Sequence, residues 1–165
     1  MRILVLSDTH IPASADELPK EIKIEAKKSD YCLHAGDFIE GKVFKLLSKW
    51  IKTYGVSGNM DRQELQKELP ETQIIKLDNL TFALAHGKGD PASVVDYITR
   101  LFAADGNSID IYIFGHSHIA FNEEIDGKIY FNPGSPTDKV FAPFRSYGIL
   151  EISNSAFKRR IVKIG

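Results

Sequence analysis

Four of the five histidines in this 165-residue chain lie in short polar segments that each follow an apolar run. The segments are Asp8-Thr9-His10, Ala85-His86-Gly87 and Gly115-His116-Ser117-His118. Two further segments of the same kind are Gly36-Asp37 and Gly58-Asn59-Met60-Asp61. Each apolar run is typical of a strand, so each polar segment is expected at the carboxyl end of a strand, where open α/β sheets collect ligand-binding groups. Together the five segments indicate a site for more than one metal ion.

The side chains of these segments offer hard oxygen donors together with borderline imidazole nitrogens. The candidate ligands are Asp8, His10, Asp37, Asn59, His86, His116 and His118. This mixture suits Mn²⁺, Fe²⁺, Zn²⁺ or Ni²⁺ better than Ca²⁺, which prefers an all-oxygen shell. Seven donors are too many for one tetrahedral ion, but they suit two ions that share a carboxylate and leave positions open for water. Two such ions, about 3.5–4 Å apart, can hold a hydroxide nucleophile and clamp a phosphoryl group for in-line attack.

Each segment taken alone also has a structural interpretation. Asp8-Thr9-His10 fits a turn with an Asx cap, and His86 fits a structural histidine. Only the combination of all five segments indicates chemistry. His34, the fifth histidine, is left outside the metal set. We expect it to be a structural group or to order a ligand through its far ring nitrogen.

The elements that must position these groups follow from the hydrophobic pattern. Apolar runs predict buried strands, and Asp78-Asn79 predicts a hairpin turn; the strand ranges are 3–6, 31–33, 55–57, 73–77, 80–85 and 111–114. Apolar residues at helical spacing predict amphipathic helices around 18–26, 43–54 and 94–102. After Ile119, alternating runs separated by Asp126-Gly127 and Asn154-Ser155 predict an antiparallel meander. Residues 1–165 are therefore expected to form one α/β domain, with two stacked sheets and helices outside them.

Composition excludes several classes of protein. Charged residues make up 26% of the chain and nearly balance, with a formal net charge of −1, so nucleic-acid binding is not indicated. The single cysteine, Cys32, excludes an internal disulfide and is expected to be buried. No stretch approaches the roughly 20 apolar residues that span a bilayer, and the apolar N-terminal run is too short for a signal peptide. We therefore expect a soluble, cytoplasmic protein that does not associate with membranes.

The order and spacing of the five segments resemble the calcineurin-like metallophosphoesterase superfamily. Its signature is Asp-x-His, Gly-Asp, Gly-Asn-His-(Asp/Glu), His and Gly-His-x-His. The short chain and Asn132-Pro133-Gly134-Ser135 resemble the small bacterial and archaeal phosphodiesterase branch. The resemblance implies a four-layer αββα sandwich of two mixed sheets flanked by helices. It also implies one ion held by Asp8, His10 and His118, a second held by Asn59, His86 and His116, and Asp37 as the bridge.

These observations predict a metal-dependent phosphodiesterase, in which a hydroxide bridging two divalent ions attacks a small phosphate ester. Asp37, Asn59 and His86 are expected to be catalytic as well as metal-ligating. Mn²⁺ is the preferred metal, with Ni²⁺, Zn²⁺, Fe²⁺ and Mg²⁺ as alternatives. One rival function is a phosphomonoesterase at the same centre. Another is a non-catalytic interaction module like the scaffold subunit of the eukaryotic retromer coat, which resembles the same branch; a homo-oligomer is left open.

The chain departs from the superfamily signature at Met60, where the signature has a histidine that stabilises the phosphate or protonates the leaving group. A thioether cannot donate a proton, so esters with poor leaving groups should react slowest. Asp61 is expected either to orient the loop or a ligand, or to cap a helix that starts near Arg62.

Residues 133–145 are a candidate substrate wall, because they combine cationic and aromatic side chains. These are Lys139, Phe141, Phe144 and Arg145. Arginine can pair with phosphate, and aromatic faces can stack on a base. The alternative is that the two phenylalanines pack a dimer or close the core.

Overall fold

Two five-stranded sheets form the centre of the protein in a computed structural model that describes residues 1–105, 108–153 and 156–165. The turn predicted at Asn154-Ser155 lies outside the described residues. The strands are β1 Arg2–Leu6, β2 Tyr31–His34, β3 Lys52–Gly55, β4 Thr72–Leu77, β5 Leu80–Ala85, β6 Ile111–Ile113, β7 Phe121–Ile125, β8 Lys128–Asn132, β9 Ser146–Ser153 and β10 Ala156–Lys163. The helices are α1 Lys20–Ala26, α2 Gly41–Trp50, α3 Gln63–Glu68 and α4 Val94–Leu101. Among the described residues, no helix has both the length and the apolar character needed to cross a bilayer.

Both sheets are mixed. The first has the order β10-β9-β1-β2-β3, with β1, β2 and β3 parallel and β9 antiparallel to both β1 and β10. The second has the order β4-β5-β6-β8-β7, with β5, β6 and β8 parallel and the outer strands antiparallel. Parallel neighbours end at the same edge of a sheet, so the carboxyl ends of three strands gather at one edge of each sheet.

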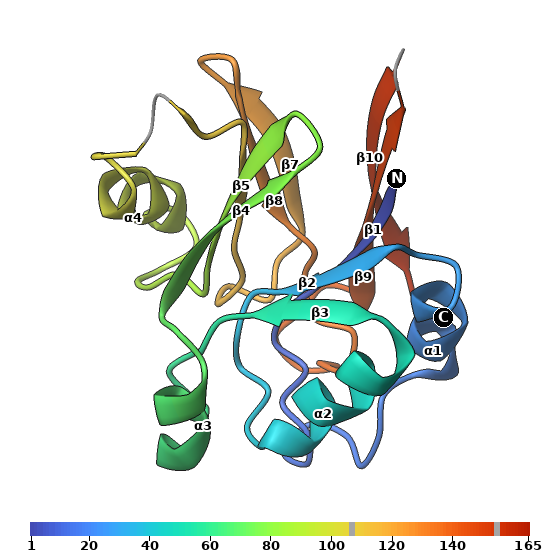
Figure 1. Cartoon of the computed structure of the whole chain (residues 1–165). Coiled ribbons are helices and arrows are strands. Elements are labelled where there is room, and N and C mark those ends of the chain that lie inside the picture. The colour runs from blue at the N-terminus through green and yellow to red at the C-terminus, as the bar shows by residue number, and fades with distance from the viewer. Residues whose placement is uncertain (106–107, 154–155) are drawn as a thin grey trace.

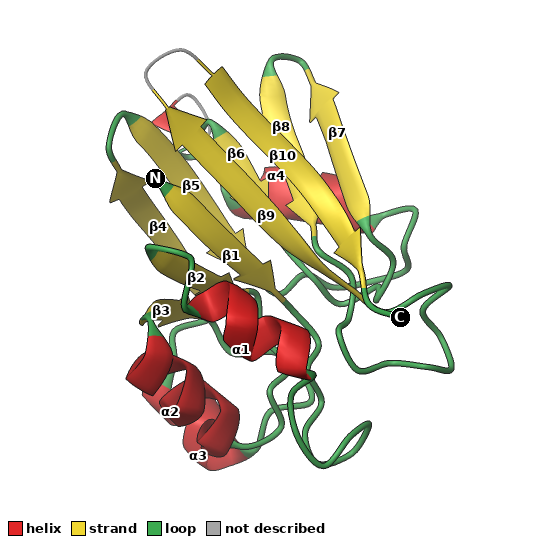
Figure 2. Ribbon diagram, turned by 90° about the vertical axis from the view of Figure 1, so that its right-hand side faces the viewer, coloured by secondary structure: helices red, strands yellow, loops and turns green. Residues whose placement is uncertain are grey.

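The alternation of side chains along β1 explains the layering. Ile3 and Val5 point into the core between the sheets, while Leu4 and Leu6 point outward to the layer of α1 and α2. In the second sheet, Phe82 and Leu84 face the first sheet, and α4 covers the opposite face. Figures 1 and 2 show the resulting order of helices, sheet, sheet and helix. The predicted four-layer αββα sandwich is therefore confirmed.

The boundary between the second helix and the third strand was predicted wrongly. The helical pattern extends to Tyr54, but α2 ends at Trp50 and Ile51 is already extended, with φ −157° and ψ 150°. The following residues form β3 and pair in parallel register with β2. The apolar side chains at 51 and 54 fit a helix face and a buried strand equally well, and pairing with β2 decides between them.

The meander predicted after Ile119 is also wrong in its connectivity. Two hairpins do form, but they belong to different sheets. The β7–β8 hairpin lies in the second sheet, where β8 is parallel to β6. The β9–β10 hairpin returns to the first sheet, where β9 pairs with β1. An alternating pattern predicts a strand with one buried face, but it does not determine which strand becomes its neighbour.

Gly148 on β9 of the first sheet packs against Phe131 on β8 of the second sheet. A Cβ atom at this position would lie 2.3 Å from Cε1 of Phe131 and 3.1 Å from Cβ of Val5. Phe131 is fully buried, so its ring has little room to move away. The approach of the sheets therefore requires a residue without a side chain at 148.

We expect Gly148→Ala to lower the free energy of unfolding by about 1–3 kcal/mol, because the added methyl group overpacks the core between the sheets. Urea denaturation measures this change. Gly41→Ala is the control, since its Cβ would meet only Leu65 Cδ1 at 3.6 Å. Its effect should stay within about 0.5 kcal/mol. Equal stability of the two variants would contradict this account of the sheet packing.

Candidate metal centre

The seven candidate ligands follow the carboxyl ends of strands in both sheets and come together between them. Asp8 and His10 follow β1, Asp37 follows β2, Asn59 follows β3, His86 follows β5, and His116 and His118 follow β6. Each of them lies close to at least one other member of the set. The predicted gathering of polar loops at one edge is thus what the structure contains.

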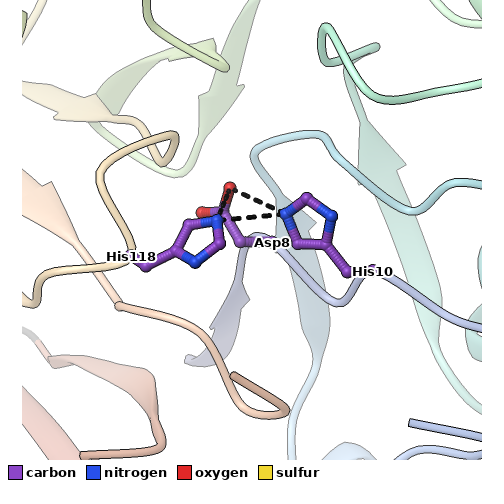
Figure 3. Close-up of side chains that lie close together, drawn as sticks. All are labelled: Asp8, His10 and His118. Atoms are coloured by element: carbon purple, nitrogen blue, oxygen red, sulfur yellow. Dashed lines mark hydrogen bonds and ion pairs between the residues drawn. The ribbon is translucent and has the colours of Figure 1, made fainter. Parts of the chain in front are cut away.

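Asp8, His10 and His118 form one compact group (Figure 3). The Nε2 atoms of the two imidazoles are 3.1 Å apart. Asp8 Oδ1 lies 3.4 Å from His118 Nε2 and 3.7 Å from His10 Nε2. Three donor atoms therefore face a common point, as one metal ion would require.

The remaining candidates form a second group, in which Asp37 and His86 lie close to Asp8 of the first group. Asp37 Oδ2 lies 3.2 Å from His86 Nε2 and 3.4 Å from His10 Nε2. The His86 and His116 rings pack edge to face at 5.2 Å, and His116 Nδ1 lies 3.1 Å from Asn59 Oδ1. The carboxylate of Asp37 thus lies between the two halves of the site.

Three of the imidazoles have their outer ring nitrogen held by an oxygen acceptor. His86 Nδ1 donates to Ala35 O over 2.7 Å, and His116 Nε2 donates to Gly89 O over 2.9 Å. His118 Nδ1 donates to Asp138 Oδ2. Carbonyl and carboxylate oxygens only accept, so these contacts place a proton on the outer nitrogen. Once the inner nitrogen carries no proton, its lone pair can bind a metal ion. This arrangement is the usual support of histidine ligands in metal sites.

A divalent cation fits this set of groups. The inner nitrogen of His86 is buried, and it makes no acceptable hydrogen bond to any residue that the structure describes. Buried polar atoms are normally satisfied, so an orphaned imidazole nitrogen aimed at two carboxylates needs another partner. Two carboxylates, four imidazoles and an amide oxygen match the donors that Mn²⁺, Zn²⁺ and Ni²⁺ accept.

The electrostatics favour positive charge between the carboxylates. Burial by itself lowers the pKa of His86, but Asp37 and Asp8 outweigh it and raise that pKa to about 9. Burial likewise raises the pKa of Asp8, yet His10 and the neighbouring imidazoles hold it below its usual value. A proton held on His86 at neutral pH competes with a metal ion for the same lone pair, so metal binding here should release protons.

Backbone strain concentrates at the candidate ligands. Five of the seven have positive φ angles: Asp8 at 53°, His10 at 42°, Asp37 at 58°, His116 at 70° and His118 at 57°. Each such residue costs about 1 kcal/mol or more, and such strain persists where surrounding structure holds it in place. Its clustering here is characteristic of a functional site.

Gly115 allows the loop after β6 to close over the Asp8 carboxylate. A Cβ atom at 115 would lie 1.7 Å from Ser7 Oγ and 2.7 Å from Asp8 Oδ2. The backbone N–H of His116 can then donate to both Asp8 oxygens, at 3.1 and 3.2 Å. The glycine that opens the Gly-His-Ser-His segment is thus explained by close approach of the backbone to Asp8.

The segment after β8 braces the site, a role that sequence reasoning missed. Ser135 Oγ donates to Asp8 O over 2.7 Å, and Thr137 Oγ1 donates to Thr9 O over 2.8 Å. Asn132 Nδ2 donates to Gly115 O over 2.9 Å. In the sequence, only a family resemblance marks the segment Asn132-Pro133-Gly134-Ser135. These bonds give the segment a structural role.

Asp138 was also missed by sequence reasoning, and no residue spacing could have revealed it. It is buried, and it accepts from the imidazole of His118, 20 residues away. Burial raises the pKa of the Asp138 carboxyl, but the hydrogen bond from His118 and those from the following backbone bring it below its usual value. An ionised carboxylate at this position fixes the His118 tautomer.

The two open questions about Asp61 and His34 are resolved by their contacts. Asp61 accepts from the backbone N–H groups of Ile39 and Gly58, each over 2.7 Å, so it orients the loops and does not cap α3. His34 is fully buried, stacks on Phe38 at 3.6 Å and lies 3.2 Å from Thr9 Oγ1. Burial lowers its pKa to about 3, so it is a neutral group behind the loop that carries Asp8 and His10.

The candidate substrate wall at 133–145 divides into two parts. Lys139 and Phe141 line a cavity of about 650 Å³ together with the ligand candidates and Met60. Phe144 packs beneath Lys163, 4.1 Å from its Nζ, and Arg145 donates to Gly165 O. The prediction for Phe144 and Arg145 as site residues therefore finds no support in their contacts.

The protein belongs to the calcineurin-like phosphoesterase superfamily, because the model of that superfamily domain matches residues 1–155. The chain is 31% identical over its full length to a probable metallophosphoesterase of Methanothermobacter thermautotrophicus, of which it covers 94%. It is 32% identical to phosphodiesterase MJ0936 of Methanocaldococcus jannaschii, with 81% of this chain and 83% of that protein covered. Among solved structures, wild-type Vps29 of Entamoeba histolytica complexed with Zn²⁺ superposes with a TM-score of 0.74 at 26% identity, covering 99% of each chain.

We expect Asp138→Asn to weaken metal binding about 10–100-fold, the usual cost of losing a partner of a ligand imidazole. The asparagine oxygen can still accept from the backbone of Val140 and Phe141, but the NH2 group that replaces Oδ2 cannot accept from His118 Nδ1. This would move the ring proton to the inner nitrogen. Titration calorimetry with Mn²⁺ measures the affinity, and ¹⁵N chemical shifts report the His118 tautomer.

Asp96→Asn provides the matched control, because Asp96 is exposed on α4 and loses the same charge. Its Mn²⁺ affinity should equal that of the wild type. An unchanged affinity in the Asp138→Asn protein would show that this carboxylate does not set the orientation of His118.

Proposed function

We propose that this protein is a metal-dependent phosphodiesterase with a binuclear centre. The observation that carries the proposal is the position of Asp37, whose Oδ2 faces His10 on one side and His86 on the other. One carboxylate oxygen between two sets of imidazoles is the arrangement in which two ions share a ligand. Asp8, His10 and His118 would hold one ion, and Asn59, His86 and His116 the other.

When bound, the two ions would supply a hydroxide nucleophile at neutral pH and neutralise charge on the phosphate. The chain's own residues do the positioning. His86, His116 and His118 present their lone pairs in fixed directions, because their outer nitrogens are already bonded. Asp37 is held by the backbone N–H of Met60 over 2.8 Å, which leaves Oδ2 directed at the imidazoles. Asn59 reaches the centre with a neutral oxygen, which adds no negative charge to repel an anionic ester.

Two cavities that meet at the centre favour a diester over a monoester. The first, of about 560 Å³, extends from Asn59 and His116 toward Lys88 and Tyr97. The second, of about 650 Å³, extends from the same two residues toward Met60 and Phe141. Both volumes are in the range of small-molecule sites. A phosphate held between them has room for a substituent on each side, whereas a monoester would use only one.

The two rival functions are less well supported. A phosphomonoesterase would share the centre but leave one of the cavities without a role. A purely protein-binding module would have no need of seven gathered ligand candidates, five of which have strained backbone conformations. Four statements stay predictions: Mn²⁺ as the metal, a cytoplasmic location, a small substrate and a single domain. The oligomeric state is left open.

We expect Asp37→Asn and His86→Ala each to reduce kcat/KM for bis(p-nitrophenyl) phosphate about 100-fold or more in Mn²⁺. Even partners of metal ligands are worth about 10–100-fold, so a ligand should be worth at least as much. Release of p-nitrophenolate measures the rate, and the metal content of each protein is determined in parallel.

Asp96→Asn should retain the full rate. The proposal fails if the fully metal-loaded wild type hydrolyses neither this diester nor p-nitrophenyl phosphate above background. It also fails if both site variants match the control. A higher kcat/KM on the monoester than on the diester would favour the phosphomonoesterase.

We expect Met60→His to raise kcat/KM for an alkoxide-leaving diester, such as a dinucleoside monophosphate, by up to about 100-fold relative to bis(p-nitrophenyl) phosphate. General acids typically contribute about 10²–10⁴-fold, and they matter most for poor leaving groups. Met60 is 54% exposed and lines the cavity beside the ligand candidates, so the new side chain can be accommodated. Met60→Leu should leave the ratio of the two rates unchanged; an equal shift in both variants would rule out proton donation as the cause.

A further inference from the structure

The cavity of about 650 Å³ beside the centre has an apolar wall made of Met60, Val140 and Phe141. These side chains are 54%, 80% and 79% exposed, and Val140 and Phe141 are the two most exposed of the nine large apolar side chains found exposed among the described residues. Three of those nine therefore lie in one cavity. A contiguous exposed apolar surface in a concave site commonly marks a place where a ligand binds.

The apolar wall is held in a fixed position although its side chains are exposed. Asp138 Oδ1 accepts from the backbone N–H groups of Val140 and Phe141, over 2.7 and 3.1 Å. Its other oxygen accepts from Ala142 N over 3.2 Å and from the ring of His118. One buried carboxylate thus ties the apolar wall and a candidate metal ligand together. A ligand would therefore meet a wall whose backbone is already ordered, which lowers the entropic cost of binding.

The apolar wall lies within reach of a phosphate at the centre. The Phe141 ring packs edge-on to the His118 ring, with centroids 6.4 Å apart and planes at 72°. The same cavity is lined by His10, Asp37 and Asn59. A phosphate ester bound at these ligands would place one of its substituents against Phe141 and Met60.

We infer that the apolar wall is a subsite for a planar aromatic group on one arm of the phosphate ester, an inference that rests on the proposed phosphodiesterase function. An exposed phenylalanine ring pairs with another aromatic ring by offset or edge-to-face contact, and a thioether makes favourable contacts with ring edges. Lys139 lines the same cavity and places a cation near the anionic ester. The side chains of the apolar wall carry no polar group that would select a hydroxylated or charged substituent.

The test measures binding directly and needs no turnover. Phenylphosphonate, cyclohexylphosphonate and methylphosphonate carry the same anionic head and differ only in the attached group. Their dissociation constants are measured by titration calorimetry with the Mn²⁺-loaded wild type and with Phe141→Ala and Phe144→Ala. Phe144 is the matched control, because it lies in the same loop but packs against Lys163 and outside the cavity.

In the wild type we expect phenylphosphonate to bind about tenfold more tightly than methylphosphonate, with cyclohexylphosphonate between them, as burial plus an aromatic contact predicts. Phe141→Ala should reduce the phenyl-to-methyl ratio to about threefold or less, since the aromatic contact is lost. Phe144→Ala should keep the wild-type ratio. Equal affinities for all probes, tighter binding of the cyclohexyl probe, or equal losses in both variants would each overturn the subsite.

The same protein samples are assayed on bis(p-nitrophenyl) phosphate, so the two proposals fail separately. Hydrolysis without a phenyl preference would leave the phosphodiesterase standing and remove the subsite. A Phe141-dependent phenyl preference without hydrolysis would establish an aromatic binding site and remove the proposed catalytic function.

Discussion

The carboxylate of Asp8 is the contact on which the rest of the site depends. It lies at the end of β1 in the first sheet, and it accepts from the backbone of His116, at the end of β6 in the second sheet. Ser7 donates to the same carboxylate over 2.6 Å. Because Asp8 is fully buried, these bonds are made away from water and set the distance between the two sheets at this edge. The two groups of candidate ligands, one largely from each sheet, can only meet while this distance holds.

The strain at the site follows from the same geometry. A chain leaving a strand must turn within one or two residues to aim Asp8 and His10 inward, and positive φ angles achieve that turn. The loop holds this conformation because other segments fix it: Ser135 and Thr137 hold its carbonyl groups, and buried His34 packs behind it. Apolar packing between the four layers therefore stabilises the fold. The hydrogen bonds of the loops then hold the ligand side chains in their strained conformations. A site assembled in this way needs little rearrangement to receive a metal ion.

The sequence predicts the parts of this structure that follow from local pattern. Polar segments after apolar runs predict the convergence of Asp8, Asp37, His86 and His116, because parallel strands end at a common edge. Local pattern does not determine which sheet β9 joins, since its partner β1 lies at the other end of the chain. It cannot reveal Asp138 either, because its partnership with His118 exists only after β8 and the following loop pack against the loop after β6. The same limit explains why Phe141 and Phe144 look alike in the sequence while only Phe141 lines the cavity.

The departure at Met60 and the apolar wall belong to one account of selectivity. Met60 stands where the superfamily signature has a histidine, and it shares its cavity with Val140 and Phe141. The side chains of these three residues present only carbon and sulfur, so none of them can protonate a leaving group bound against them. Aromatic alcohols are better leaving groups than alkyl alcohols, because the ring stabilises the anion. An apolar wall that selects an aromatic group would therefore place beside Met60 a leaving group that depends little on protonation. Such a group is the kind that needs a proton donor at position 60 least. Selection by binding would then offset the loss of acid catalysis, and Asp138 would hold Val140 and Phe141 in place beside the candidate metal ligand His118.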